Sequence, residues 1–289
     1  DIHPHVIAAD ERRYRLAPVG GQMSAWARSR PVTTEALIAA MDRTGVAQAV
    51  IVQASTAYGY DNSSVTDSAG LWPGRLAAVA CVNPLSHQVG AEIDHWVAER
   101  GAAGLRLFAA GSTIGDKSGW LDSPDTFPAW EAALRHRTPV CVQTRFSNLA
   151  RLRTMLERFP GVRVVLDHMA YPDLTNGPAH AAAEPLLALA DCPNLYLKLT
   201  LRNLEPLARA NGGPTPFLRR LVDAFGADRI AWGSNFPAAA NPLCDLVALA
   251  VNACSGLGPD ERRWIAAGTA RRLYPALADA KSPSERGLP

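Results

Sequence analysis

The sequence predicts a (β/α)₈ barrel, a closed parallel sheet surrounded by helices. Apolar, strand-like runs alternate with helical segments along most of the 289 residues, and eight such runs can be counted. The runs are continuously apolar, as expected for parallel strands that are covered on both faces. A G-x-G-x-x-G motif does not follow the first run, which disfavours the alternative of a doubly wound open sheet. Eight strand–helix units over this length favour a barrel of the TIM type.

The strand candidates are short and are separated by helices. We expect strands at residues 1–5, 46–53, 76–82, 103–108, 139–143, 162–167, 195–199 and 230–233. We expect helices at 33–44, 62–71, 89–100, 127–137, 149–159, 181–190, 215–225, 242–253 and 259–273. Thr33 or Thr34 can cap the first helix, which Gly45 ends, and Thr215 can cap the helix that has Pro216 at its first position.

Two segments fall outside this alternation. Residues 6–32 form a long irregular stretch that contains Trp26, and we interpret it as a lid or wall beside the site, with a mobile surface loop as the alternative. Residues 277–289 are rich in Ser, Pro, Lys and Gly and resemble a solvated tail. The predicted organisation is therefore one barrel over residues 1–276 and a C-terminal tail over 277–289.

Composition excludes several classes of function. The chain is 48% hydrophobic and 19% charged with a net charge of +2, and no basic run is dense enough for a nucleic-acid surface. No apolar stretch is long enough to cross a bilayer. The five cysteines form no Cys-x-x-Cys pair, which argues against zinc-ribbon and thioredoxin folds and fits a reducing cytoplasm. We expect a cytoplasmic protein without nucleic-acid or membrane partners, and a homodimer is compatible with the sequence.

Three histidines fall where a barrel places its chemistry, at the carboxyl ends of the strands. His3 and His5 share a face of the first strand because side chains alternate, and His168 follows the sixth strand. A single histidine at a strand end is more often a structural residue than a ligand. Together the three predict a site at the open end of the barrel where their imidazoles converge. His87, His95, His136 and His180 lie away from strand ends, so we expect them to be ordinary surface residues.

Cationic and polar residues accompany these histidines. Arg106 lies inside an apolar run and needs an anionic partner, either a structural Asp or Glu or a substrate carboxylate, which a guanidinium can bind through two hydrogen bonds. With Arg145 and Arg202 also near the mouth, we favour a small anionic substrate. Lys198 is assigned equally to a binding role and to a salt bridge. The expected substrate-binding residues are Arg106, Ser55, Gln143, Arg145, Tyr171 and Arg202.

Several segments resemble one family in order and spacing. They are Asp1-Ile2-His3-Pro4-His5, Val50 to Ser55, Gly104-Leu105-Arg106, Leu166-Asp167-His168-Met169, Trp232 to Pro237 and Thr269 to Tyr274. Over residues 1 to about 276 the chain resembles the amidohydrolase-related branch of the amidohydrolase superfamily. It is most similar there to the lactone hydrolases that include 2-pyrone-4,6-dicarboxylate hydrolase, with sulfomuconolactone hydrolase and sugar lactonases as relatives.

The resemblance implies a distorted barrel that hydrolyses a ring ester. It assigns catalytic positions to His3, His5, His168 and residue 235, and a carboxylate-binding role to Arg106. Residue 235 takes the place of the aspartate that acts as general base on water in this family, but this chain has Asn235. An amide can orient water and cannot accept its proton. The loop after His168, Ala170-Tyr171-Pro172-Asp173, also departs from the pyrone hydrolase pattern, which weakens the transfer of that enzyme's diacid substrate.

Three explanations of Asn235 stay open. Another base such as a histidine or a metal-bound hydroxide could act, the position could have been changed from Asp to capture substrate, or the barrel could bind ligand without turnover. We expect that no cofactor is required, and a single Zn or Mn ion on His3, His5 and His168 is the alternative. Hydrolysis of a carboxylated lactone is the leading hypothesis. A metal-dependent decarboxylase of an aromatic or unsaturated acid and a non-catalytic ligand-binding barrel are the others.

Overall fold

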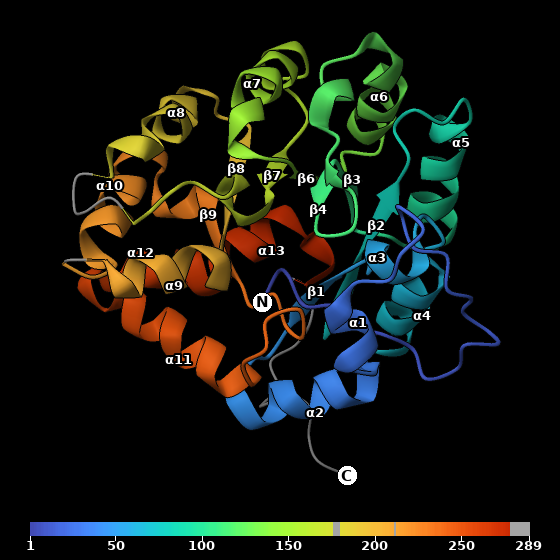
Figure 1. Cartoon of the computed structure of the whole chain (residues 1–289), viewed down its shortest axis with the longest axis horizontal. Helices are drawn as coiled ribbons and strands as arrows, with labels where there is room; N and C mark the ends of the chain where they lie inside the picture. Colours follow the sequence, from blue (N-terminus) through green and yellow to red (C-terminus); the bar gives the residue numbers. More distant parts are fainter. Residues whose placement is uncertain (176–179, 211, 278–289) are drawn as a thin grey trace.

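The computed structural model describes residues 1–175, 180–210 and 212–277, and its centre is a parallel sheet curled into a barrel (Figure 1). The tail predicted for 277–289 lies outside the described residues except for its first residue. Seven strands follow one another in the order β1-β2-β3-β6-β7-β8-β9. Their bounds are β1 Ala49–Val52, β2 Leu76–Val82, β3 Gly104–Phe108, β6 Val140–Gln143, β7 Val164–Leu166, β8 Leu195–Thr200 and β9 Ile230–Gly233. Each of these coincides with a predicted strand, so the fold class is confirmed.

The first segment of the chain closes the barrel between β9 and β1, although it is not a regular strand. On one side the amides of Ile2 and His5 donate to the carbonyls of Trp232 and Phe236. On the other side Val50 and Val52 donate to the carbonyls of Asp1 and Pro4. A step of two residues along β1, from Val50 to Val52, is thus matched by a step of three along the first segment, from Asp1 to Pro4. The first segment has one extra residue at this point, as in a β-bulge. Pro4 also lacks an N–H, so the ladder is interrupted where a regular strand was expected.

Helices surround the strands (Figure 1). Those that match predictions are α2 Thr34–Thr44, α4 Ser63–Leu71, α5 Val89–Asp94 with a π-helical turn His95–Glu99, α6 Phe127–Arg135, α7 Leu149–Arg158, α8 Glu184–Leu187 between 3₁₀ turns, α10 Thr215–Phe225, α11 Leu243–Ala253, α12 Pro259–Arg263 and α13 Thr269–Leu273. A π-helical turn, Trp264–Gly268, joins α12 to α13.

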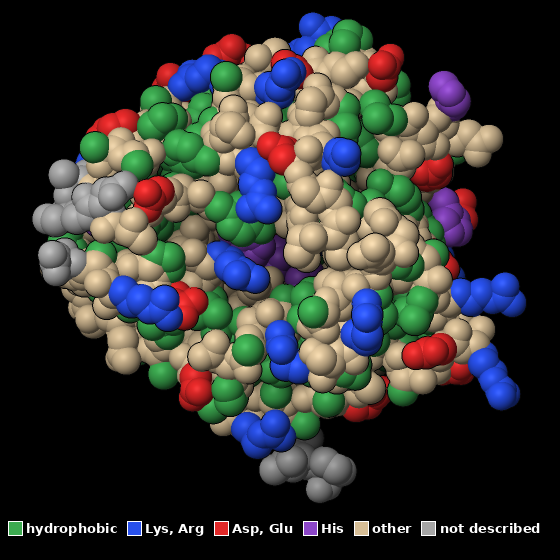
Figure 2. Space-filling view, in the orientation of Figure 1, with side chains coloured by type: hydrophobic (Ala, Val, Ile, Leu, Met, Phe, Trp, Pro, Cys, Tyr) green, Lys and Arg blue, Asp and Glu red, His purple; other side chains and the backbone are tan. Residues whose placement is uncertain are grey.

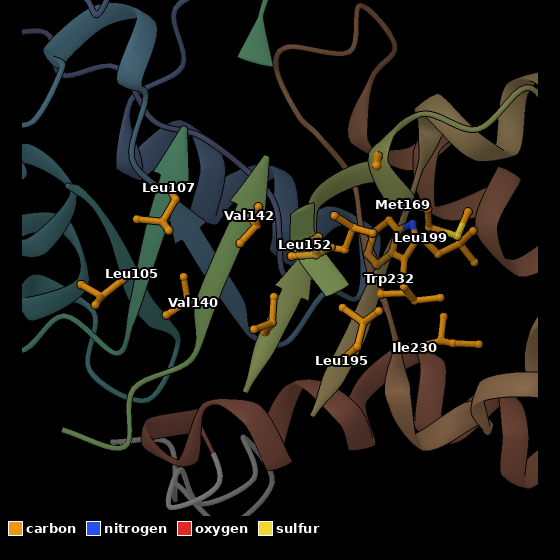
Figure 3. Packing of buried hydrophobic residues seen from close by; sticks show 14 of the residues in the cluster. Leu105, Leu107, Val140, Val142, Leu152, Met169, Leu195, Leu199, Ile230 and Trp232 are labelled. Atoms are coloured by element: carbon orange, nitrogen blue, oxygen red, sulfur yellow. The ribbon is translucent and has the colours of Figure 1, made fainter. Parts of the chain in front are cut away.

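Apolar packing forms two layers, one outside the sheet and one inside it. Leu105, Leu107, Val140, Val142 and Leu195 belong to the outer cluster, between the strands and the helices (Figure 3). Within the barrel, residues of the strands pack on α13, which closes the end opposite the carboxyl ends of the strands; this inner cluster includes Val50, Val79, Cys141, Leu273 and Tyr274. The closed end leaves one open end for a site.

Four elements were not predicted. They are α1 Ala25–Ser29 within the irregular stretch, α3 Ser55–Tyr58, α9 Leu201–Arg209 and the small hairpin of β4 Ala110–Gly111 with β5 Gly115–Asp116. Pro206 lies inside α9, and an interior proline usually argues against a helix. A capping box in which the side chains of Thr200 and Asn203 satisfy backbone groups at the start of α9 offsets that cost.

Two further expectations were wrong. His180 is buried beside Phe217, with ring centroids 5.0 Å apart, and is not a surface residue, because α10 packs its apolar face over it. Pro214, not Thr215, occupies the N-cap of α10.

All five cysteines are free thiols, and all except Cys244 are buried. In the described parts of the chain, no helix has the length and apolar character needed to span a bilayer.

Candidate active site

A cavity of about 300 Å³ lies at the carboxyl ends of the strands. All ten predicted site residues line it: His3, His5, Ser55, Arg106, Gln143, Arg145, His168, Tyr171, Arg202 and Asn235. Figure 2 shows histidine side chains at the floor of a hollow on this face, with Lys and Arg side chains beside it. A larger cavity of about 660 Å³ lies at the other end of the barrel, between α11, α13 and the start of β1, and contains none of the ten.

The three predicted histidines are brought together, because segments from opposite ends of the sequence become neighbours in the closed barrel. The ring centroids of His3 and His5 are 5.0 Å apart, and those of His3 and His168 are 4.7 Å apart. Burial, aided by the charge of Arg106, lowers the pKa of His5 to about 3. Burial also lowers the pKa of His168 to about 3, although the charge of Asp167 opposes this. These imidazoles are therefore neutral at pH 7.

A buried ion network lies beneath the histidines. Asp167 Oδ1 is 2.8 Å from Lys198 Nζ, and Asp167 Oδ2 accepts from Arg106 Nε at 3.0 Å. Burial alone would raise the pKa of Asp167, but the charges of Lys198 and Arg106 lower it to about 2. The partner of Arg106 is thus a structural aspartate, one of the two that the sequence allowed, and Lys198 forms a salt bridge.

The network continues from the floor of the cavity to its rim. Arg106 donates to Gln143 Oε1, whose amide nitrogen donates to the hydroxyl of Tyr171 at 3.2 Å. Burial raises the pKa of Tyr171 to about 12, so this phenol remains protonated at neutral pH. The guanidinium of Arg145 lies over the Tyr171 ring, 4.9 Å from its centroid.

His168 is held by a short left-handed turn and by the start of α9. Residues His168, Met169, Ala170 and Tyr171 all have positive φ, between 53° and 62°. Each such residue costs roughly 1–2 kcal/mol, so other contacts must hold the turn. The amide of Asn203 donates to the His168 carbonyl at 2.8 Å, and Thr200 Oγ1 lies 2.8 Å from His168 Nδ1.

These contacts define which nitrogen of His168 and His5 carries the proton. The Thr200 hydroxyl donates to Asn203 Oδ1, so it accepts from Nδ1–H of His168. His5 Nδ1 lies 2.8 Å from the carbonyl of Val52, which can only accept. Both rings therefore direct a free Nε2 lone pair towards the cavity, because neither Nε2 has a hydrogen-bond partner among the residues that the structure describes.

The irregular stretch forms a wall of the cavity. The ring of Trp26 stacks on His5, with centroids 5.2 Å apart and planes inclined by 27°. Trp26 also lines the cavity. The stretch is anchored on α3 through the amides of Ala17 and Val19, which donate to the carbonyls of Ala57 and Ser55. Of the two interpretations of residues 6–32, the wall is the one that these contacts support.

Asn235 follows β9 and lies close to the first strand. Its φ is +59°, and 4% of its surface is exposed. The preceding residues are fixed by Asp1, whose Oδ1 accepts from the amides of Ser234 at 2.8 Å and His3 at 3.0 Å. Gly233 leaves room for the first segment of the chain, because a Cβ there would lie 2.6 Å from the Cβ of His3.

Among the residues missing from the predicted set are four that contact its members: Trp26, Asp167, Thr200 and Asn203. Three of these four carried a signal in the sequence. Asp167 directly precedes His168 at the end of an apolar strand, and Thr200-x-x-Asn203 has the spacing of a capping box. The contact of Trp26 with His5 joins an irregular loop to a strand, and no periodicity indicates it.

Comparison with known proteins shows the family of this chain. A sequence model of the amidohydrolase family matches residues 1–276. The chain belongs to the amidohydrolase family. This confirms the resemblance and the expected class of enzyme, a hydrolase of the amidohydrolase type. An L-fucono-1,5-lactonase from Burkholderia ambifaria is 29% identical over 259 residues, which are 84% of each chain.

Solved structures show the same barrel. A Pseudomonas putida protein provisionally named 2-pyrone-4,6-dicarboxylic acid hydrolase has a TM-score of 0.76 at 22% identity, covering 96% of this chain and 97% of its own. A zinc-bound amidohydrolase from Burkholderia multivorans has a TM-score of 0.74 at 22% identity, covering 95% and 98%. A 2,6-dihydroxybenzoate decarboxylase from Rhizobium has a TM-score of 0.64 at 15% identity, covering 94% and 97%.

The zinc in the Burkholderia multivorans relative raises the question of a metal here. Within the described ranges, no group of three or more His, Cys, Asp or Glu side chains is arranged to hold one. His3 Nδ1 is occupied by Lys198 Nζ at 3.0 Å, and position 235 offers a neutral amide instead of a carboxylate. The residues present do not fit a metal, so the chemistry below uses protein groups alone. That no cofactor is required stays a prediction.

Proposed function

We propose that this amidohydrolase opens small lactones that carry a carboxylate. The observation that supports the proposal most is that one cavity contains both neutral imidazoles and guanidinium groups without a salt-bridge partner among the described residues. Arg145 and Arg202 line the cavity, and in the described chain neither has a carboxylate within salt-bridge distance, although the charge of Arg145 also acts on Asp116. A substrate carboxylate would supply the missing partner, since a guanidinium binds it with strong, charge-assisted hydrogen bonds.

The reaction follows from the lone pairs and donors at the floor. A water molecule oriented by Asn235 attacks the lactone carbonyl carbon, and His168 Nε2 takes a proton from it. The ring C–O bond then breaks, and the proton returns to the leaving oxygen, which gives a hydroxy acid. A pKa near 3 makes free His168 a weak base, but negative charge that develops on the nearby carbonyl oxygen favours the imidazolium.

Arg106 has a different role in this proposal from the one that the resemblance implies. Its guanidinium is already ion-paired with Asp167, a carboxylate that it shares with Lys198, and it donates to Gln143. Arg106 therefore orients Gln143 and Tyr171, while Arg145 and Arg202 bind the substrate's carboxylate at the rim. Ser55, buried at the start of α3, borders the same cavity.

A panel of lactones tests the proposal. The protein should open at least one carboxylated lactone more efficiently than a neutral sugar lactone such as L-fucono-1,5-lactone. Arg145→Met should raise KM for the carboxylated substrate about ten- to a hundredfold, as expected for a lost hydrogen bond to a charged group. The same change should leave KM for a neutral lactone as it was. Arg151→Met, at an exposed ion pair on α7, is the matched control.

Other outcomes decide against the proposal. A clear preference for neutral lactones would remove the role of the arginines. Release of carbon dioxide from an aromatic acid without ring opening would favour a decarboxylase instead. Tight binding of lactones without turnover, unchanged in Asn235→Asp, would favour a ligand-binding barrel.

A further inference from the structure

Lys198 is the only described lysine inside the barrel, and the reaction above gives it no role. Its side chain is 0% exposed, and its Nζ lies 2.8 Å from Asp167 Oδ1 and 3.0 Å from His3 Nδ1. An ammonium group has three hydrogens and no lone pair, so it can only donate. His3 Nδ1 must therefore accept, which requires an unprotonated Nδ1 and places the imidazole hydrogen on Nε2.

One alternative partner for His3 Nδ1 lies nearby. Asp167 Oδ1 is 3.6 Å from it, and an Nδ1–H could point at that carboxylate. This distance is longer than a hydrogen bond, whereas the contact with Lys198 is within the normal range. A hydrogen on Nδ1 would also face the ammonium, donor against donor. The lysine contact therefore decides the tautomer of His3.

The opposite nitrogen of His3 then lacks an acceptor. Nε2 is buried and has no hydrogen-bond partner among the described residues, although the side chain lines the cavity. A buried donor without a partner costs about 1–3 kcal/mol. The carbonyl oxygen of a substrate would be a suitable acceptor, and its hydrogen bond would strengthen as negative charge develops on it.

We propose that Lys198 is a positioning residue that holds His3 as an Nε2–H donor to the substrate's carbonyl oxygen. His3 then differs from His5 and His168, whose Nε2 atoms carry lone pairs. The three histidines divide into one donor and two acceptors, and Lys198 determines that division. The inference rests on the proposed function only for the identity of the acceptor; the tautomer of His3 is a property of the free protein.

Nitrogen NMR of protein labelled with ¹⁵N in its histidine rings tests the tautomer directly. Long-range proton–nitrogen spectra distinguish the protonated from the unprotonated ring nitrogen, and His3→Gln assigns the signals of His3. The unaltered protein at pH 7 should show His3 protonated at Nε2. Protonation at Nδ1 would overturn the proposal, and this measurement on the unaltered protein needs no substrate.

Lys198→Met supplies the second test. It leaves Asp167 and Arg106 as a balanced pair, and Asp167 becomes the remaining partner for His3 Nδ1. The His3 signals should change to those of the Nδ1–H tautomer, and kcat should fall about 10²- to 10³-fold with little change in KM, as for loss of an oxyanion donor. Exposed Lys117→Met is the control and should leave both as they were.

The two kinds of failure can be distinguished. An unchanged His3 tautomer in folded Lys198→Met would overturn the role of the lysine, whatever the substrate. If the tautomer switches as expected but no lactone is opened by the unaltered protein, the proposed function fails and the assignment of His3 stands. A fall in kcat without a change of tautomer would show that Lys198 acts only through packing.

Discussion

In the proposed reaction, Asn235 and His168 divide the task that the family resemblance assigns to one aspartate. The amide can hold water in place, and the imidazole has the free lone pair. This division depends on the proton of His168 being on Nδ1, which Thr200 accepts at 2.8 Å. His168 can therefore serve as the base in the proposed reaction, even though position 235 is not acidic.

Replacement of His168 tests this assignment. His168→Asn should lower kcat on a carboxylated lactone about 10²- to 10⁴-fold, the usual contribution of a general base. Adding Asn235→Asp to that variant should recover part of the loss, because the carboxylate can accept the proton that the imidazole no longer takes. Steady-state kinetics of the single and double variants provide the measurement. Equal rates for His168→Asn and the unaltered protein would exclude His168 as the base.

Gly233 allows the first segment of the chain, which contains His3, to approach β9. Gly233→Ala would place a Cβ 2.6 Å from the Cβ of His3, and neither backbone can move away easily inside the barrel. We expect the variant to displace His3, to lower kcat at least tenfold and to lower the melting temperature. Gly70→Ala is the matched control, since no atom lies within 4 Å of the added Cβ and the residue is helical. There the change should stabilise the fold by about 0.5–1 kcal/mol.

At the scale of elements, α9 and the left-handed turn act together. Asn203 is fully buried and joins them: its amide nitrogen donates to the His168 carbonyl, and its oxygen accepts from the backbone amide of Thr200. Asn203→Ala should reduce the free energy of unfolding by about 1–3 kcal/mol, because buried partners lose their hydrogen bonds. It should also lower kcat, because the His168 carbonyl would lose the hydrogen bond that holds the turn in place.

Chemical denaturation and kinetics of the same preparations measure both effects. Asn148→Ala removes an exposed hydrogen bond to Asp116 at the start of α7, and it should change stability by less than about 0.5 kcal/mol. If Asn203→Ala resembled Asn148→Ala in both stability and kcat, α9 would not position the site.

The regular elements could be predicted because local signals agree with the final structure. The seven strands are apolar runs between helices, and strand ends meet at one mouth in any such barrel, so most of the ten cavity residues could be found from their position. The catalytic place of residue 235 and the loop with Tyr171 came from the family resemblance.

The interrupted pairing of the first segment was missed because it depends on its fit between the distant strands β9 and β1. Helix α9 was missed because Pro206 argues against a helix, although the Thr200-x-x-Asn203 spacing was a local signal for its start. For Arg106, the sequence shows that an anion is needed, while only the fold shows that Asp167 provides it.

At the scale of the molecule, burial of neutral histidines makes stability depend on pH. The pKa values of His5 and His168 are lowered to about 3, and burial lowers the pKa of His3 well below its usual value of 6.5. In the unfolded chain these groups bind protons below about pH 6.5, whereas in the folded protein His5 and His168 do so only near pH 3. The unfolded state therefore binds more protons between these limits, and stability falls as the pH falls.

His5 and His168 should each contribute about 1.4 kcal/mol per pH unit in this window, and His3 acts in the same direction. Their contribution to stability is fully present above pH 6.5 and is lost progressively towards pH 3. Asp167, whose pKa is lowered to about 2, adds a further loss only below its ordinary value of 3.8.

Urea unfolding between pH 7.5 and 5 should therefore show a steep loss of stability as the pH is lowered. His5→Gln should make the dependence shallower by about one proton, whereas His87→Gln at an exposed loop position should leave it as in the parent protein. A dependence that is the same in both variants would mean that His5 is not buried as a neutral ring.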